Sequence, residues 1–318
     1  MRIVYLGSSH FGVHCLEILK DSRHELAHII TQPAHKAGRG RKLKPTDAAA
    51  WAADNNIDCT EAADINSPEI MDLASSLNPD IYVVIAFGQK ISQGFISTAR
   101  YGAINVHASL LPKYRGAAPI NRAIVEGETE TGVTIITLAE KMDAGKMLGK
   151  SVIPIEPDDN AQTIHDKLAL ISAPLLLKTL DDIESGTAVY ENQDESKVTF
   201  AKKLQKSDGN INWQQPAEAI CRHIRGFWPW PGAFTNYVVA KTGRCYKLTI
   251  ADAAVADDDP NVETRVPGRF DTNMNVICGE GTLKIKSVKP AGSRRMDFQA
   301  FLNGRETGPD DLFMDVGF

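Results

Sequence analysis

The run DIYVVIAF, residues 80–87, is the clearest strand signal of the chain and sets the architecture around it. Apolar runs of similar length lie on both sides of it, and helical patterns separate them. The expected strands are 3–7, 26–31, 80–87, 103–107 and 133–138, and the expected helices are 11–20, 46–55, 68–77, 90–99 and 118–126. Apolar strands that alternate with helices predict an α/β fold with a doubly wound, mainly parallel sheet.

The pattern changes after Gly209, and 318 residues are enough for two domains. A long amphipathic helix is expected over 161–183, followed by a polar linker over 189–208. After a helix from Pro216 to Arg225, short strands are expected at 234–240, 245–255, 265–271, 274–278 and 281–289. Short strands with turn residues predict a small β-barrel of the oligonucleotide-binding (OB) kind. The predicted domains are therefore 1–188 and 209–318, and FWPWPGAF (227–234) is expected to be an apolar plug between them.

Composition narrows the class of protein. The chain is 43% hydrophobic and 24% charged, with a net charge of −5, as in an ordinary globular protein. No apolar run approaches 18 residues, so we expect no membrane span. The N-terminal MRIVYLGSS lacks an apolar h-region and a cleavage site, so we expect no secretory signal. The five cysteines are scattered and no histidine pair has metal-ligand spacing, so we expect neither a disulfide framework nor a metal site. A cytoplasmic protein is the expectation.

Asn105 and His107 lie in NVHASLLPKYRGAAPI, residues 105–120, at the end of an apolar strand. Two residues apart on a strand, their side chains point to the same side. Sites of open parallel sheets form beyond the carboxyl ends of strands, so Asp143, after the expected strand 133–138, is predicted to join them. An amide can donate to an oxyanion, an imidazole can donate or shuttle a proton, and a carboxylate can orient the imidazole. This constellation predicts acyl transfer without a covalent enzyme intermediate.

Two basic patches interrupt an otherwise acidic chain. Residues 35–44 (HKAGRGRKLK) and 196–206 (SKVTFAKKLQK) contain no aspartate and no glutamate. Such patches can engage phosphates without making the whole protein basic. A solvated loop is the competing interpretation of 38–42.

With these motifs, the chain resembles the folate-dependent formyltransferases over essentially its whole length. NVHASLLPKYRGAAPIN is similar to the hallmark of that family, and ETGVTIITLAEKMDAG is similar to its aspartate segment. TQPAHKAGRGRKLKP is similar to the acceptor-arm loop of the members that act on tRNA. The chain departs from the family pattern at Ser9, His10 and Lys146.

The resemblance implies 10-formyltetrahydrofolate as formyl donor and the α-amino group of methionine on initiator tRNA as acceptor. It implies Asn105, His107 and Asp143 as catalytic residues, a cis Leu111–Pro112 bond and a monomer. The folate-binding residues that it implies are Val84, Ile85, Ala86, Phe87, Gly88, Gln89, Ser109, Leu110, Leu111 and Pro112. The tRNA-binding residues that we expect are Lys36, Arg39, Arg41, Lys42, Lys44, Lys203 and Lys206.

Three alternatives stay open at this point. Formylation of an amino sugar would make 35–44 an ordinary loop. A tRNA-binding module with an inactive site would bind tetrahydrofolate without turnover. A nicotinamide-dependent dehydrogenase is disfavoured because GSSHFG, residues 7–12, lacks the glycine fingerprint.

Overall fold

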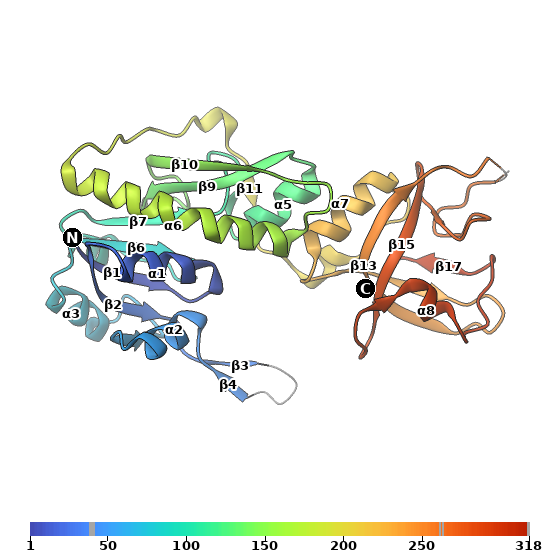
Figure 1. Cartoon of the computed structure of the whole chain (residues 1–318), viewed down its shortest axis with the longest axis horizontal. Helices are drawn as coiled ribbons and strands as arrows, with labels where there is room; N and C mark the ends of the chain where they lie inside the picture. Colours follow the sequence, from blue (N-terminus) through green and yellow to red (C-terminus); the bar gives the residue numbers. More distant parts are fainter. Residues whose placement is uncertain (38–41, 261, 263, 317–318) are drawn as a thin grey trace. The chain divides into compact units, whose positions relative to one another are not determined.

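The computed structural model describes residues 1–37, 42–260, 262 and 264–316, and its two large sheets belong to different units of the chain (Figure 1). The N-terminal unit consists of Met1–Pro119, Glu130–Pro154 and His165–Ala201. The C-terminal unit consists of Ile120–Thr129, Ile155–Ile164 and Lys202–Phe318. The domain limits predicted above, 1–188 and 209–318 with a linker over 189–208, stay a prediction.

The N-terminal unit is built on a seven-stranded sheet with the order β10-β9-β7-β6-β1-β2-β5. Its strands are β1 (Arg2–Gly7), β2 (Glu25–Thr31), β5 (Cys59–Glu61), β6 (Ile81–Ile85), β7 (Ala103–His107), β9 (Glu130–Thr137) and β10 (Met147–Pro154). β1 pairs in parallel with β2 and β6, β2 with β5, and β6 with β7. β9 runs antiparallel to both β7 and β10. The mainly parallel α/β sheet predicted from the sequence is therefore confirmed.

Both faces of this sheet are covered, which explains why its central strands are apolar throughout. On one face, Val4 and Tyr82 pack with Ile70 of α3 and Phe95 of α4. Alternation along β1 turns Tyr5 to the opposite face. The helices of the first 185 residues are η1 (His10–Gly12), α1 (Val13–Lys20), α2 (Asp47–Asn55), α3 (Pro68–Ser76), α4 (Gln93–Ile96), α5 (Pro119–Glu126) and α6 (Ala161–Ser185). Burying each large apolar side chain contributes about 1.5–3 kcal/mol.

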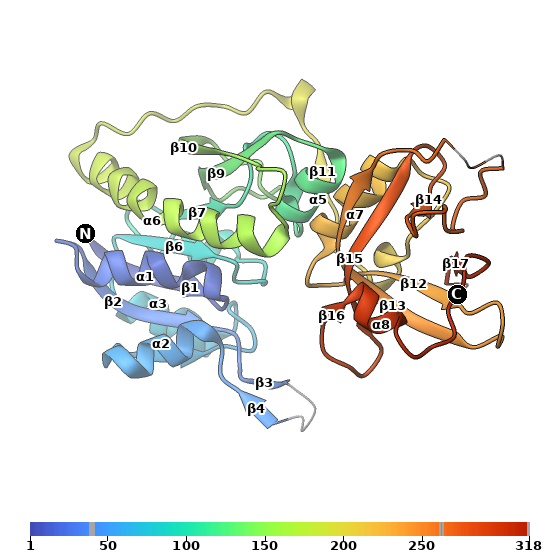
Figure 2. The same ribbon diagram turned by 45° about the vertical axis from the view of Figure 1, so that its right-hand side comes forward.

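The basic patch 35–44 contains a short hairpin. β3 (His35–Ala37) and β4 (Lys42–Lys44) pair antiparallel and extend away from α2 in both views (Figures 1 and 2). The chain then enters α2 through Thr46, whose hydroxyl accepts a hydrogen bond from Ala49 N at 3.1 Å. Such an N-cap satisfies one of the free backbone N–H groups in the first turn of the helix.

The C-terminal unit contains a second, antiparallel sheet with the order β14-β15-β13-β12-β17, and β16 pairs with β15. The strands are β12 (Ala233–Val238), β13 (Cys245–Ala256), β14 (Val276–Ile277), β15 (Thr282–Pro290), β16 (Met296–Asp297) and β17 (Leu312–Met314). The prediction of a strand over 265–271 is wrong, because these residues form no regular strand. Instead, Gly268 bonds to both end strands: its N–H donates to Ile277 O and its carbonyl accepts from Phe313 N, each at 2.8 Å. These bonds link β14 with β17 and complete the predicted barrel.

Aromatic side chains fill this barrel. Tyr237, Phe301 and Phe313 are almost fully buried, and the Tyr237 ring contacts Phe301 edge-on and Phe313 in a tilted arrangement. The remaining helical segments are η2 (Glu195–Lys197), η3 (Lys206–Gly209), α7 (Ala217–Phe227) and α8 (Phe298–Leu302), and the remaining strands are β8 (Arg115–Gly116) and β11 (Phe200–Ala201). Within the run 227–234, Phe227 and Phe234 are buried and 57% of Trp230 is exposed; the expected plug between the domains stays a prediction. Within the described residues, every helix is too short or too polar to cross a membrane.

Candidate active site

His107 is the best-defined polar group of the predicted site. It is the last residue of β7 and is only 6% exposed. Its Nε2 lies 3.0 Å from the carbonyl oxygen of Tyr114. Because a carbonyl only accepts hydrogen bonds, Nε2 carries the hydrogen and Nδ1 is the nitrogen left for chemistry. Nδ1 faces Asp143 Oδ2 at 3.7 Å.

Asp143 meets His107 by a route that differs from the predicted one. We expected Asp143 to lie near His107 because it would follow the carboxyl end of a parallel strand. The strand direction assumed in that prediction is wrong. β9 is antiparallel to β7, so Thr137 pairs with Ile104 at the start of β7. The loop after β9 must therefore fold back toward His107. The backbone N–H of Gly116 donates to Asp143 Oδ2 at 2.8 Å and holds the carboxylate there.

Asn105 occupies the middle of β7, where its backbone pairs with Val84 of β6 and Ile136 of β9. Strand alternation turns its side chain to the same side as that of His107. The residue is half-buried. The structure therefore brings His107 and Asp143 together and places Asn105 on the same face of the sheet.

The first predicted folate segment continues directly from β6. Val84 and Phe87 are buried, whereas Ala86 and Gly88 are exposed. Gln89 is committed elsewhere: its Nε2 donates to Ala62 O and its Oε1 accepts from Ile65 N, both at 2.8 Å. Any contact of Gln89 with folate would have to compete with these bonds.

Side chains of β9 and β10 hold the backbone of the second predicted folate segment, Ser109–Pro112. The Thr134 hydroxyl donates to Ser109 O at 2.7 Å and accepts from Leu111 N at 3.1 Å. The Lys150 ammonium donates to Leu111 O at 2.6 Å. The Leu111–Pro112 peptide bond is cis, as expected. Because these backbone groups already have partners, fewer of them remain to read a pteridine ring than the sequence suggested.

Two residues of this neighbourhood carry no signal in the sequence. Arg115 is 4% exposed and its guanidinium bonds to Gln193 and Glu195. Gln193 also donates to the backbone of the Asp143 turn. A polar segment that reads as a linker, and an arginine inside a loop motif, gave no reason to single them out.

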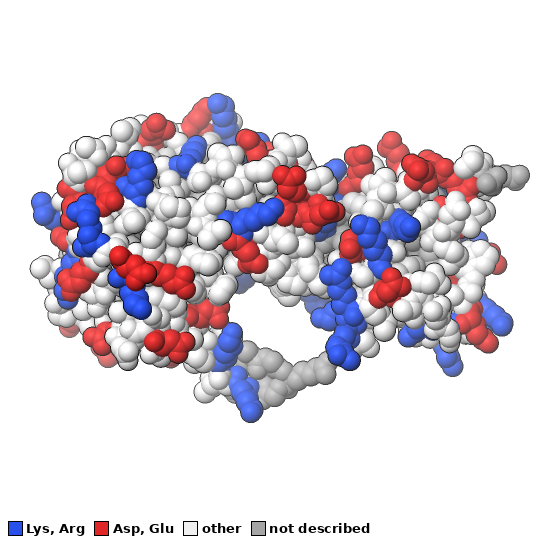
Figure 3. Space-filling model, in the orientation of Figure 1, with Lys and Arg blue, Asp and Glu red and all other residues white. Residues whose placement is uncertain are grey.

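The predicted tRNA-binding residues come from two segments, one in each unit, and their role stays a prediction. Arg39, Arg41 and the side chain of Lys36 lie outside the described residues. Lys42 and Lys44 are exposed on β4, and Lys44 lies 3.2 Å from Asp47. Lys203 and Lys206 are also exposed, and Lys206 is the first residue of η3. On the face drawn in Figure 3, acidic and basic side chains are interspersed.

Among the described residues, one group of side chains that could act as metal ligands lies close together. It consists of His24, Asp181 and Glu184. Arg23 lies 2.7 Å from each of the two carboxylates. The N-terminal ammonium of Met1 lies 2.8 Å from Glu184 as well, so two cations balance the two carboxylates. The cluster is therefore better described as an ion-pair network than as a cation site.

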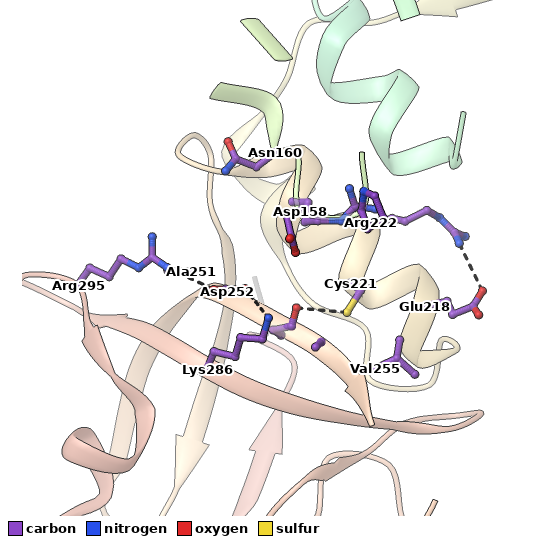
Figure 4. A pocket seen from close by; sticks show the side chains of 14 residues that line it. Asp158, Asn160, Glu218, Cys221, Arg222, Ala251, Asp252, Val255, Lys286 and Arg295 are labelled. Carbon is purple, nitrogen blue, oxygen red and sulfur yellow. Dashed lines mark hydrogen bonds and ion pairs between the residues drawn. The ribbon is translucent and has the colours of Figure 1, made fainter. Parts of the chain in front are cut away.

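A cavity of about 690 Å³ opens in the C-terminal unit between α7, β13 and β15 (Figure 4). Arg222 pairs with Glu218 at 3.9 Å across its rim, and Lys286 pairs with Asp252 at 3.9 Å. Burial raises the pKa of the Cys221 thiol to about 11, so this thiol stays protonated at neutral pH. None of the predicted site residues that the structure describes lines this cavity, so the chemistry is assigned to the β7 site on geometry.

Comparisons with known proteins agree with this geometry. The formyl transferase family matches residues 1–180, and the formyl transferase C-terminal domain matches residues 203–306. A methionyl-tRNA formyltransferase of Geobacter metallireducens is 37% identical over 97% of this chain and 97% of its own, and one of Methylococcus capsulatus is 39% identical over 95% and 96%. The crystal structure of an N-formyltransferase from Helicobacter canadensis, in complex with folinic acid and dTDP-3-aminofucose, has a TM-score of 0.65 at 16% identity. The structural match covers 89% of the present chain and 98% of the Helicobacter canadensis chain.

Proposed function

The chain belongs to the formyl transferase family, and we propose that it transfers a formyl group from 10-formyltetrahydrofolate to the α-amino group of methionine on initiator tRNA. The names of relatives that match over nearly the whole chain support this acceptor. The observation that carries the chemistry is the approach of His107 Nδ1 to Asp143 Oδ2, 3.7 Å apart, on the same strand face as Asn105. Nothing in this arrangement requires a covalent nucleophile.

In the proposed reaction, the unprotonated amine attacks the formyl carbon on N10 of the folate. The new N–C bond gives a tetrahedral intermediate, and Asn105 donates a hydrogen bond to its negative oxygen. The bond from carbon to N10 then breaks, and the proton that leaves the amine ends on N10. His107 relays this proton through Nδ1, because its Nε2–H is committed to Tyr114 O, and Asp143 stabilises the imidazolium. A proton on Nδ1 also stabilises the oxyanion.

The test is turnover by Asn105→Ala, His107→Ala and Asp143→Asn. An oxyanion donor contributes about 10²–10³ in rate and a positioned acid or base about 10²–10⁴, so each variant should lose at least about two orders of magnitude in kcat. Circular dichroism should show an unchanged fold. Asp166→Asn, the same change at an exposed position of α6, should keep normal turnover. Near-normal turnover in two of the three site variants would contradict the assignment.

An amino-sugar acceptor is the second candidate, because the Helicobacter canadensis structure shares the fold. Its 16% identity supports the fold alone. Purified protein, labelled formyl donor and either methionyl initiator tRNA or a nucleotide-linked amino sugar would separate the two. We expect transfer only to the tRNA.

We also propose that the enzyme works as a monomer in the cytoplasm, where initiator tRNA is charged and used. Light scattering at working concentrations should give the mass of one chain, 34.7 kDa. A dimer mass would overturn the first part of this proposal.

A further inference from the structure

Gln193 lies in the polar segment that resembles a linker, yet it is only 9% exposed. Its Oε1 accepts from Arg115 Nε at 3.0 Å and from Arg115 Nη2 at 2.9 Å. Its Nε2 donates to Asp143 O at 2.7 Å and to Gly145 O at 2.8 Å. A glutamine amide has two donor hydrogens and two acceptor lone pairs, so this side chain is saturated. Such a site selects an amide rather than any polar residue.

The turn that Gln193 holds is a demanding one. Asp143 has a φ of +51°, which residues other than glycine rarely adopt. At Gly145, a Cβ atom would lie 1.7 Å from Thr137 O, so the turn packs directly on β9. Left-handed backbone of this kind persists only when the surroundings fix it. The two hydrogen bonds from Gln193 supply that constraint.

Asp143 is thereby held at two points. Gly116 N–H fixes the carboxylate, and Gln193 fixes the backbone. Arg115, the residue before Gly116, joins the two points because its guanidinium donates to Gln193 Oε1. Any movement of the amide would therefore shift Asp143 with respect to His107.

We propose that Gln193 is a positioning residue that sets Asp143 against His107 Nδ1 for proton transfer. This inference rests on the proposed function, since it acts through the role given there to Asp143. Because the Gln193 amide is saturated by partners within the protein, its role is to position Asp143 and not to bind substrate. Its effect should therefore appear in kcat and not in the KM for either substrate.

The decisive variant is Gln193→Glu. Glutamate keeps the size of the side chain and can still accept from Arg115, but a carboxylate cannot donate to the carbonyls of Asp143 and Gly145. A displacement on the order of 1 Å lowers rates by about 10²-fold, so we expect kcat to fall by about that factor with both KM values unchanged. Gln299→Glu, the same change at an exposed position of α8, should match the wild type. A wild-type kcat for Gln193→Glu would overturn the proposal.

A double-mutant cycle separates positioning from a general structural role. If Gln193 acts only through Asp143, Gln193→Glu should lower kcat in the wild type and have no further effect on an Asp143→Ala background. Equal losses on both backgrounds would overturn the proposal while leaving the proposed function in place. Normal turnover by Asp143→Ala alone would instead remove the proposed role of Asp143 and, with it, that of Gln193.

Folding is checked by urea unfolding of each variant. If Gln193→Glu does not fold, Gln193→Asn takes its place in the cycle, because it keeps the amide and retracts it by one methylene. The same expectations and the same contrary outcomes then apply to Gln193→Asn.

Discussion

At the scale of single residues, one hydroxyl shapes the loop that follows His107. Thr134 is fully buried in β9, and its Oγ1 bridges Ser109 O and Leu111 N. Thr134→Val keeps the shape of the side chain and leaves both backbone groups unpaired. Each unpaired buried group costs about 1–3 kcal/mol, so we expect a loss of that order in the free energy of unfolding and a higher KM for the folate. Urea titration and initial rates measure the two effects.

The control for this prediction is Thr134→Ser, which restores the hydroxyl and removes only a methyl group. Thr134→Ser should bind folate like the wild type. Equal KM values for the serine and valine variants would show that the hydroxyl does not organise Ser109–Pro112.

The sequence predicted some of these residues and not others for a clear reason. Asn105 and His107 could be paired because strand alternation acts over two residues. The partners that fix them come from farther away: Tyr114 is seven residues from His107, and Gln193 is 50 residues from Asp143. No local pattern encodes contacts across such separations, so the support of the site became visible only in the fold.

At the scale of elements, the β3–β4 hairpin should contact the phosphates of the tRNA. Lys42 is exposed on β4 and no described acid pairs with it, whereas Lys44 is paired with Asp47. Lys42→Ala should therefore raise the KM for methionyl-tRNA more than the KM for folate. One lost phosphate contact should also flatten the slope of log(kcat/KM) against log salt by roughly 0.7–0.9.

Lys178→Ala is the control for the loss of one exposed positive charge outside both basic patches, because Lys178 lies on α6, where its ammonium pairs with Asp182 at 2.6 Å. The slope of log(kcat/KM) against log salt should be the same for Lys178→Ala as for the wild type. An unchanged slope in Lys42→Ala would show that this side chain of the hairpin stays in solvent when tRNA binds.

Element identity was predictable, and element direction was not. The apolar runs of β1, β2, β6, β7 and β9 were found in the sequence because burial on two faces leaves a continuous hydrophobic signal. β10 and β5 were missed: β10 alternates between half-buried and exposed residues, and β5 is only three residues long. The antiparallel direction of β9 depends on its partner strands, and no feature of 133–138 marks it.

At the scale of the whole molecule, contacts far apart in sequence define the two units. Residues 120–129 and 155–164 group with the C-terminal unit, although the sequence places them among the strands and helices of the N-terminal half. Asn121 Nδ2 donates to Gly226 O and Arg225 Nη1 donates to Asp159 O, both at 2.7 Å. Such bonds tie α7 to two earlier segments, which a scan for composition changes cannot detect.

Each unit also contains a histidine that should make folding sensitive to acid. Burial is the main cause that lowers the pKa of His28 in the N-terminal unit and of His223 in the C-terminal unit below the ordinary value of 6.5. Because the unfolded chain binds protons more readily, their contribution to stability is complete above pH 6.5 and is lost as the pH falls below it. The free energy of unfolding should therefore be smaller at about pH 5.5 than at about pH 7.5.

His28→Gln isolates one of these two groups. Glutamine cannot take up a proton, yet it can keep the hydrogen bond that His28 Nε2 shares with Thr60 Oγ1 at 2.9 Å. Urea unfolding at both pH values should show a smaller acid-induced loss for His28→Gln than for the wild type. His10→Gln changes an exposed position, and its free energy of unfolding should fall between the two pH values by as much as that of the wild type. An equal loss in His28→Gln would mean that the acid sensitivity arises at other groups, with His223 the next to replace.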